Sequence, residues 1–92
     1  MSGFKKPLPL TIFPTDTNDS KKSWKAYFEI MEPSQMKIRL ESFSSAPDFG
    51  SDILVVFYDA THRFQFDSAI LSENHNGFIN IRKPKVIYKR SL

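Results

Sequence analysis

Cysteine is absent from this 92-residue chain, and glycine is scarce, with only three residues. The absence of cysteine excludes a disulfide scaffold, a thiolate metal site and a cysteine nucleophile. The longest apolar run spans residues 53–58, far short of the ~20 residues that a membrane-spanning helix needs. The first residues also lack the apolar stretch of a signal peptide. We therefore expect a cytoplasmic protein that does not insert into a membrane.

Residues that favour helices are few, whereas β-branched and aromatic residues are abundant. The chain has four Ala and six Leu, against 28 residues of Val, Ile, Phe, Tyr, Trp and Thr. This bias favours sheet over helix. Hydrophobic residues make up 40% and charged residues 25%, which is typical of a globular protein. We expect one barrel-like β domain over residues 8–88, preceded by a flexible N-terminus at residues 1–7.

Positive charge is concentrated near the C-terminal end. Residues 82–92 carry five Lys or Arg and no acid, whereas residues 1–81 carry eight Lys or Arg and ten Asp or Glu. A basic tail is typical of a segment that faces an anion or a nucleic acid, and it is also typical of a solubilising terminus. Composition alone leaves both interpretations open.

Alternation of apolar and polar residues predicts short strands separated by polar turns. Residues 20–31 also fit a helical stripe that ends before Pro33, but we interpret residues 24–32 as a strand because residues 36–41 alternate so regularly. Prolines at both ends of residues 8–13 predict an edge strand there. The other expected strands are 52–58, which is apolar on both faces and therefore central or covered, 63–72, 78–82 and 85–88.

The two strands around Pro33 are expected to form a hairpin. With residues 33–35 as the loop, Ile30 meets Ile38 on the core face. Glu29 then meets Arg39 on the solvent face, and an opposite-charge pair of this kind contributes ~0.2–1 kcal/mol. Apolar and charged partners agree on this one register.

Two features of the C-terminal half predict how the sheet bends. Phe64 and Phe66 face one way along their strand, whereas its later apolar residues need the opposite face, so we expect a bulge at residues 67–69. Asn76 and Gly77 accept the positive φ values of a tight hairpin turn. We therefore predict an all-β fold, a small antiparallel split-barrel-like domain of about six strands.

No residue pattern points to catalysis. The only histidines, His62 and His75, fall in predicted turns without partners at metal-ligand spacing. Three glycines form no phosphate-binding loop, and no serine lies in a G-x-S-x-G context. We expect a protein that is not an enzyme, with no metal site and no cofactor of its own.

Basic and aromatic residues share one face of the first predicted hairpin. Binders of single-stranded nucleic acids combine cations for the phosphates with rings for the bases. Glu29 and Glu41 lie on the same face and offset most of its charge, so we expect no more than weak binding of nucleic acid. The candidate interaction face consists of Lys25, Tyr27, Lys37, Arg39 and Phe43.

Four segments of the C-terminal half together match the strand pattern of a known domain family. They are Asp52-Ile-Leu-Val-Val-Phe-Tyr, Arg63-Phe-Gln-Phe-Asp-Ser-Ala-Ile, Gly77-Phe-Ile-Asn-Ile-Arg-Lys-Pro and Ile87-Tyr-Lys-Arg. Over residues 52–90 the chain resembles the N-terminal domain of YcgR-type flagellar brake proteins, in which a barrel-like domain precedes a PilZ domain that binds cyclic di-GMP. Residues 24–43 fit the earlier hairpin of that family in outline. The family's R-x-x-x-R element and the D/N-x-S-x-x-G element of PilZ domains are absent from these 92 residues.

The resemblance implies a non-catalytic interaction or regulatory module in cyclic di-GMP signalling and flagellar motility. It implies a PilZ domain in cis or a flagellar motor protein as partner, and cyclic di-GMP as a ligand only if a PilZ domain follows. Residues 89–92 would then begin a basic linker, with Lys89 and Arg90 close to the ligand. The alternative function is that of a small basic and aromatic barrel that binds single-stranded nucleic acid. The oligomeric state stays open.

Overall fold

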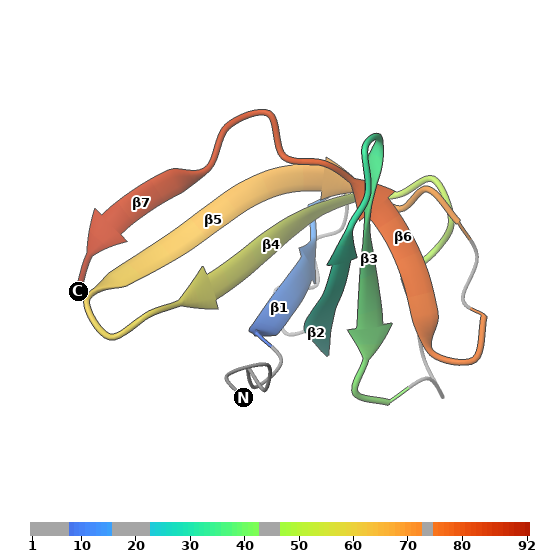
Figure 1. Ribbon diagram of the computed structural model, residues 1–92, viewed down its shortest axis with the longest axis horizontal. Helices are drawn as coiled ribbons and strands as arrows, with labels where there is room; N and C mark the ends of the chain where they lie inside the picture. The colour runs from blue at the N-terminus through green and yellow to red at the C-terminus, as the bar shows by residue number, and fades with distance from the viewer. Residues whose placement is uncertain (1–7, 16–22, 43–46, 73–74) are drawn as a thin grey trace, which may run out of the picture.

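The computed structural model describes residues 8–15, 23–42, 47–72 and 75–92. These residues form seven β-strands and no helix (Figure 1), so the described part of the chain has no helix able to cross a membrane. The strands are β1 (Pro9–Pro14), β2 (Trp24–Met31), β3 (Gln35–Leu40), β4 (Asp52–Tyr58), β5 (His62–Ala69), β6 (Phe78–Arg82) and β7 (Tyr88–Ser91). The expected flexible segment at residues 1–7 lies outside the described residues.

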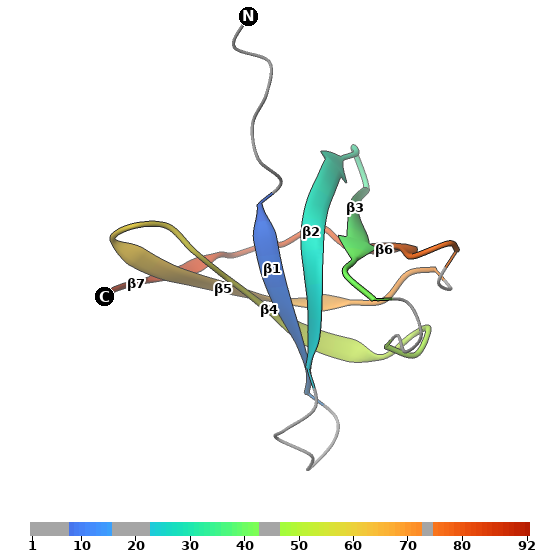
Figure 2. The same ribbon diagram turned by 90° about the horizontal axis from the view of Figure 1, so that it is seen from below.

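All seven strands belong to one antiparallel sheet, in the order β6-β3-β2-β1-β4-β5-β7. The predicted all-β antiparallel class is therefore confirmed. The sheet curls but does not close, because β5 and β6 form no ladder; Ser68 and Arg82 share one hydrogen bond, and an isolated bridge joins Ile70, just past β5, to Ile81. Figure 2 shows β4 and β5 crossing behind β1 and β2 at a steep angle. The ends of β4 and β5, together with β7, extend to one side (Figure 1), and we call residues 57–65 and 88–91 the arm.

The core fills the concave side of the curled sheet. Phe66, only 1% exposed, is the largest fully buried side chain. In β4 both Val55 and Val56 are buried, which fits its position between β1 and β5 and confirms the prediction from its two apolar faces. The buried apolar cluster comprises Leu10, Ile12, Trp24, Ala26, Met36, Ile38, Leu40, Ile53, Val55, Phe66, Ile70, Ile79 and Ile81.

The first strand is central rather than at an edge, so that prediction is wrong. β1 pairs with β2 on one side and with β4 on the other. Its prolines are tolerated because Pro9 is the first residue of the strand and Pro14 the last, where a missing N–H removes little of the ladder. The ladder continues just outside them, since Phe28 N–H donates to the carbonyl of Leu8 (2.9 Å).

The register of the β2–β3 hairpin also differs from the prediction. Phe28, rather than Ile30, lies opposite Ile38. The register shifts between Phe28 and Ile30, which marks a bulge at Glu29 and turns the following side chain to the other face of the sheet. Ile30 is consequently 53% exposed. The turn is tighter than expected as well, because Glu32 N–H donates to the Gln35 carbonyl (2.9 Å).

The bulge predicted at residues 67–69 is absent, because the β4–β5 ladder runs without a shift from Asp52–Ala69 to Tyr58–Arg63. The strand keeps one alternation because Ser68 occupies a core position. Its hydroxyl donates to the Arg82 carbonyl (2.7 Å), so the polar group is buried with a partner. Ile70 then bridges to Ile81 of β6, and the Leu71 N–H donates to the Asn80 carbonyl (2.8 Å).

The prediction for the turn at residues 76–77 is confirmed, whereas the prediction for the last strand is wrong. Asn76 (φ 54°) and Gly77 (φ 88°) take the positive φ values expected of them, between reciprocal hydrogen bonds of His75 and Phe78. The last strand is Tyr88–Ser91 rather than residues 85–88, and it pairs with the first half of β5. The chain therefore stays in the sheet beyond residue 88.

Candidate functional site

The outer face of β2 and β3 brings together most of the predicted interaction residues and pairs its arginine with a carboxylate of the same face. Tyr27 and Arg39 lie directly opposite each other, and the Arg39 guanidinium sits 4.9 Å from the centre of the Tyr27 ring. Arg39 Nε also donates to Glu29 Oε1 at 2.8 Å. The Tyr27 hydroxyl donates to Glu41 Oε1 at 3.2 Å. The Tyr27 ring and the Arg39 guanidinium therefore already have partners within the chain.

The two lysines predicted for this face differ in their surroundings. The Lys37 ammonium lies 5.6 Å from the centre of the Phe78 ring, within reach of a cation–π interaction. Lys25 is exposed two residues before Tyr27 and so shares its face. Phe43 lies outside the described residues. We call this surface the β2–β3 face.

Lys89 and Arg90, the other predicted site residues, lie within β7 rather than beyond the sheet. Arg90 is paired with Arg63, and Lys89 is paired with Phe64. Directly opposite residues point to the same side of a sheet, so Arg63 and Arg90 share the outer face of the arm. Lys89 points to the concave side with Phe64, which stacks on Phe57 at 4.9 Å between ring centres.

A shallow basic hollow lies on the arm around the two arginines. Its volume is about 290 Å³, and it is lined by Arg63, Gln65, Tyr88, Lys89 and Arg90. We call the outer surface formed by Arg63, Gln65, Tyr88 and Arg90 the β5–β7 face. The Arg63 guanidinium is oriented by a hydrogen bond to Gln65 Oε1. Gln65 in turn lies opposite Tyr88, whose ring is 58% exposed.

No described carboxylate lies within ion-pair distance of the cations around this hollow. In the part of the chain that the structure describes, the only ion pairs within 4.0 Å are Arg39–Glu29 and His62–Asp59, and neither includes Arg63, Lys89 or Arg90. Like charges directly opposite on a sheet are destabilising. The Arg63–Arg90 pair therefore costs stability in the isolated chain, and an anion placed between them would relieve that cost.

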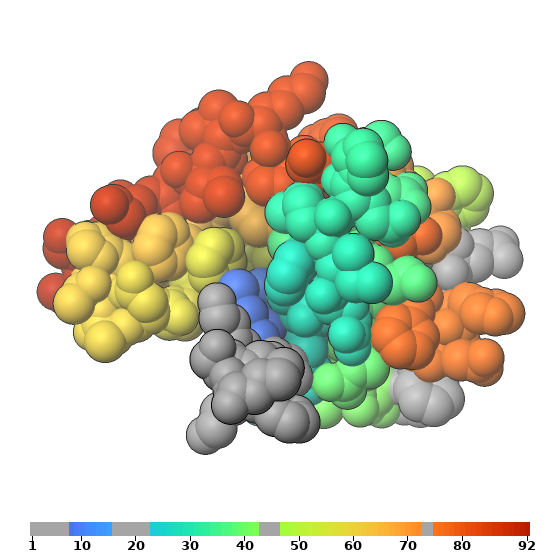
Figure 3. All heavy atoms as spheres, viewed as in Figure 1, coloured from blue at the N-terminus to red at the C-terminus, as the bar shows by residue number. Residues whose placement is uncertain are grey.

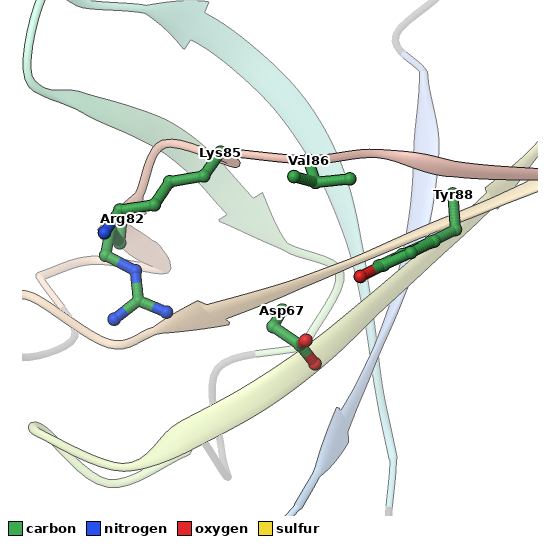
Figure 4. A pocket seen from close by; sticks show the side chains of 5 residues that line it. All are labelled: Asp67, Arg82, Lys85, Val86 and Tyr88. Carbon is green, nitrogen blue, oxygen red and sulfur yellow. The ribbon is translucent and has the colours of Figure 1, made fainter.

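A second hollow of about 230 Å³ borders the first, and Tyr88 lines both. Arg82 and Lys85 contribute positive charge to it, and Figure 4 shows the Asp67 carboxylate in the same hollow as the Arg82 side chain and the Tyr88 ring. Because Asp67 offsets part of the charge, this second hollow suits an anion less well than the first.

Sequence reasoning missed Arg63, Gln65 and Tyr88 as members of a site. A signal was present for the first two, since Arg63-Phe-Gln-Phe places Arg63 and Gln65 on the same side of a strand, away from the phenylalanines. No signal in the sequence showed that residues 88–91 would pair with this strand, and this pairing is what brings Arg90 to Arg63.

The histidines and acids of the described residues form no cluster of three or more that would hold a metal ion. The most ordered acidic group is Asp59, in the turn between β4 and β5. The backbone N–H groups of Thr61 and His62 both donate to Asp59 Oδ1 at 2.7 Å and lower the pKa of this carboxyl below 3.8. Because Asp59 is fully exposed and bound to its own turn, we assign it a structural role.

Comparison of the chain with protein-family models, with curated proteins and with solved structures found no match.

Proposed function

We propose that the chain is a non-catalytic interaction module of cyclic di-GMP signalling in the cytoplasm, with a role like that of the N-terminal domain of YcgR-type flagellar brakes. The observation that supports it best is the Arg63–Arg90 pair, which presents positive charge without a carboxylate partner among the described residues. The proposed partner is a PilZ domain in cis or a flagellar motor protein, reached through the β5–β7 face.

The chemistry of this face suits an anionic group on a partner. A guanidinium grips a phosphate or carboxylate with two parallel hydrogen bonds, and Arg63 and Arg90 lie side by side to do so. The hollow of about 290 Å³ is shallow, at or below the ~300–1,000 Å³ of typical ligand pockets. It offers charge without enclosure, so a second surface must complete any nucleotide site.

Calorimetry tests this proposal directly. Residues 1–92 should show no saturable binding of cyclic di-GMP at tens of micromolar. If the coding sequence continues into an R-x-x-x-R element and a PilZ domain, the longer chain should bind, and Arg90→Ala should weaken binding by about tenfold or less because Arg90 flanks the ligand. Tight binding by residues 1–92 alone would contradict the proposal, since it would require an enclosed pocket in this domain.

A binder of single-stranded nucleic acid is the second candidate, and one observation favours it. The exposed Tyr88 ring lies between Arg63 and Arg90 in one hollow and Arg82 and Lys85 in the other, which combines a stacking surface with cations. The test measures binding of oligothymidylate at about 150 mM salt and then at higher salt. For a nucleic-acid binder, log affinity should fall by ~0.7 per unit of log salt concentration for each phosphate that the protein neutralises. Sub-micromolar binding that is lost in Arg63→Glu but kept in Lys37→Glu would favour this function over the first.

A further inference from the structure

An apolar groove opens on the concave side of the sheet, where the curl fails to close. In the space-filling view, the arm (yellow), the segment before β7 (red) and β2 (teal) border a furrow (Figure 3). The groove has a volume of about 180 Å³. Its lining consists of Leu8, Leu10, Phe28, Met31, Met36, Phe57, Phe66, Pro84 and Ile87.

The groove is an uncovered continuation of the core. Phe66 at its floor is 1% exposed and meets Phe57 edge-on, with 6.4 Å between the ring centres. At the rim, however, Met31 is 47% exposed and Ile87 48% exposed. Large apolar side chains that gather in this way around a recess are typical of a site that contacts another molecule.

The wall of the groove restricts the backbone of any occupant. Its exposed surface is entirely apolar, so it offers no donor or acceptor to a bound chain. An extended peptide would leave its N–H and C=O groups without partners there, and each such group costs free energy. A helix satisfies these groups internally and presents only side chains, as in helix-in-groove recognition.

The size of the groove disfavours a small molecule. A volume of about 180 Å³ lies below the ~300–1,000 Å³ of typical ligand pockets. It suits instead one or two large apolar anchors that a protein partner inserts from its own surface, which is how binding energy concentrates in protein interfaces.

The charged residues around the groove indicate which charge the partner carries beside its apolar anchors. Lys89 points to the concave side beside Phe64, and Lys83 adjoins Pro84 in the chain. On the opposite rim Glu32 follows Met31 and accepts a hydrogen bond from Gln35 Nε2 at 3.3 Å. The side formed by the arm and the segment before β7 is therefore basic.

We propose that this groove binds an amphipathic helix of a partner protein, with large apolar residues in the groove and acidic residues toward Lys89. The site lies on the concave side of the sheet and is distinct from the β5–β7 face, so it stands whether or not the function proposed above is correct.

A designed helical peptide provides the probe, with Leu at positions spaced i, i+3, i+4 and i+7 and Glu elsewhere on its length. Its binding to the 92-residue chain would be followed by methyl NMR of the Met and Ile side chains. We expect the Met31, Met36 and Ile87 methyl signals to shift. Ile87→Glu and Met31→Glu, both at half-exposed positions that tolerate a charge, should each weaken binding at least tenfold.

Val86→Glu is the matched control, because Val86 is adjacent to Ile87 and 56% exposed but lines the hollow on the other face. It should change binding twofold or less, as should Arg63→Gln. The proposal is overturned if the Leu/Glu peptide fails to bind at ~1 mM, the scale of a −4 kcal/mol interaction. It is also overturned if a Leu/Lys peptide binds equally well, if decanoate binds in the groove while the peptide does not, or if the chain dimerises through Met31 and Ile87.

Discussion

The arginines on the two outer faces of the sheet differ in whether a carboxylate lies beside them. On the β2–β3 face, Arg39 is bound to Glu29 at 2.8 Å and stacked over Tyr27. On the β5–β7 face, Arg63 lies opposite Arg90, and no described carboxylate is within ion-pair distance of either. The arginine of the first face is paired within the chain, whereas the two arginines of the second face lie opposite each other without a described carboxylate. The juxtaposition of two unpaired arginines, rather than the number of cations, distinguishes the candidate site.

The largest expected effect separates the core from the exposed aromatic residue of the candidate site. Phe66→Ala should reduce the free energy of unfolding by ~3–5 kcal/mol, because the ring is 1% exposed and its removal leaves a cavity. Tyr88→Ala should change it by ~0.5 kcal/mol or less, because that ring is 58% exposed. Urea denaturation of both variants provides the measurement. A loss below about 1 kcal/mol for Phe66→Ala would contradict the described core.

A smaller effect is expected at Ser68, the buried polar residue of β5. Ser68→Ala removes the hydroxyl that donates to the Arg82 carbonyl at 2.7 Å and should cost ~1–3 kcal/mol by leaving that buried contact unmade. The same change at the exposed Ser91 serves as the control. Equal denaturation midpoints for the two variants would show that Ser68 is not in the core.

Charge reversal should have opposite effects on the two faces. Arg63→Glu places an acid opposite Arg90 and should stabilise the fold by ~0.2–1 kcal/mol. Arg39→Glu instead removes the pair with Glu29, which is partly exposed, and should destabilise the fold by a similar ~0.2–1 kcal/mol. Thermal unfolding of the two variants at low salt measures the difference. Destabilisation by Arg63→Glu would show that the arginine pair is structurally satisfied.

The smallest effect concerns the turn at the tip of the arm. The N–H groups of Thr61 and His62 lower the pKa of Asp59, so its carboxylate stabilises the turn above its ordinary pKa of 3.8, and the stabilisation is lost as the pH falls through the lower, folded value. An NMR titration of the Asp59 carboxyl should therefore have its midpoint below 3.8. A midpoint at or above that value would mean that the turn does not hold in solution.

Sequence reasoning predicted the fold class and most strands because alternation and turn residues are local signals. β4, β6 and the Asn76–Gly77 turn occur where they were expected. Sequence reasoning failed where a contact with a residue far away in the sequence determines the local structure. Ser68 was placed in a predicted bulge because nothing local indicates that the Arg82 carbonyl would accept its hydroxyl hydrogen bond in the core. No local residue pattern predicts the bulge at Glu29 either.

The candidate site was predicted only in part, for the same reason. Lys89 and Arg90 were predicted from the family resemblance of residues 52–90, but Arg63, which lies 27 positions before Arg90, is brought close only by the pairing of β5 with β7. The β2–β3 face was predicted with its offsetting acids, and the contacts of Arg39 with Glu29 and of Tyr27 with Glu41 show how they act.

The contrast between the two faces is tested most directly by two double variants of equal net charge. Arg63→Gln with Arg90→Gln removes two charges from the β5–β7 face, and Lys25→Gln with Lys37→Gln removes two from the β2–β3 face. Elution from heparin, a polyanionic probe, reports how strongly each face attracts anions, because affinity falls with salt in proportion to the contacts made. We predict that the Arg63/Arg90 variant elutes at clearly lower salt than the Lys25/Lys37 variant. Equal elution, or the reverse order, would contradict the assignment of the candidate site to the β5–β7 face.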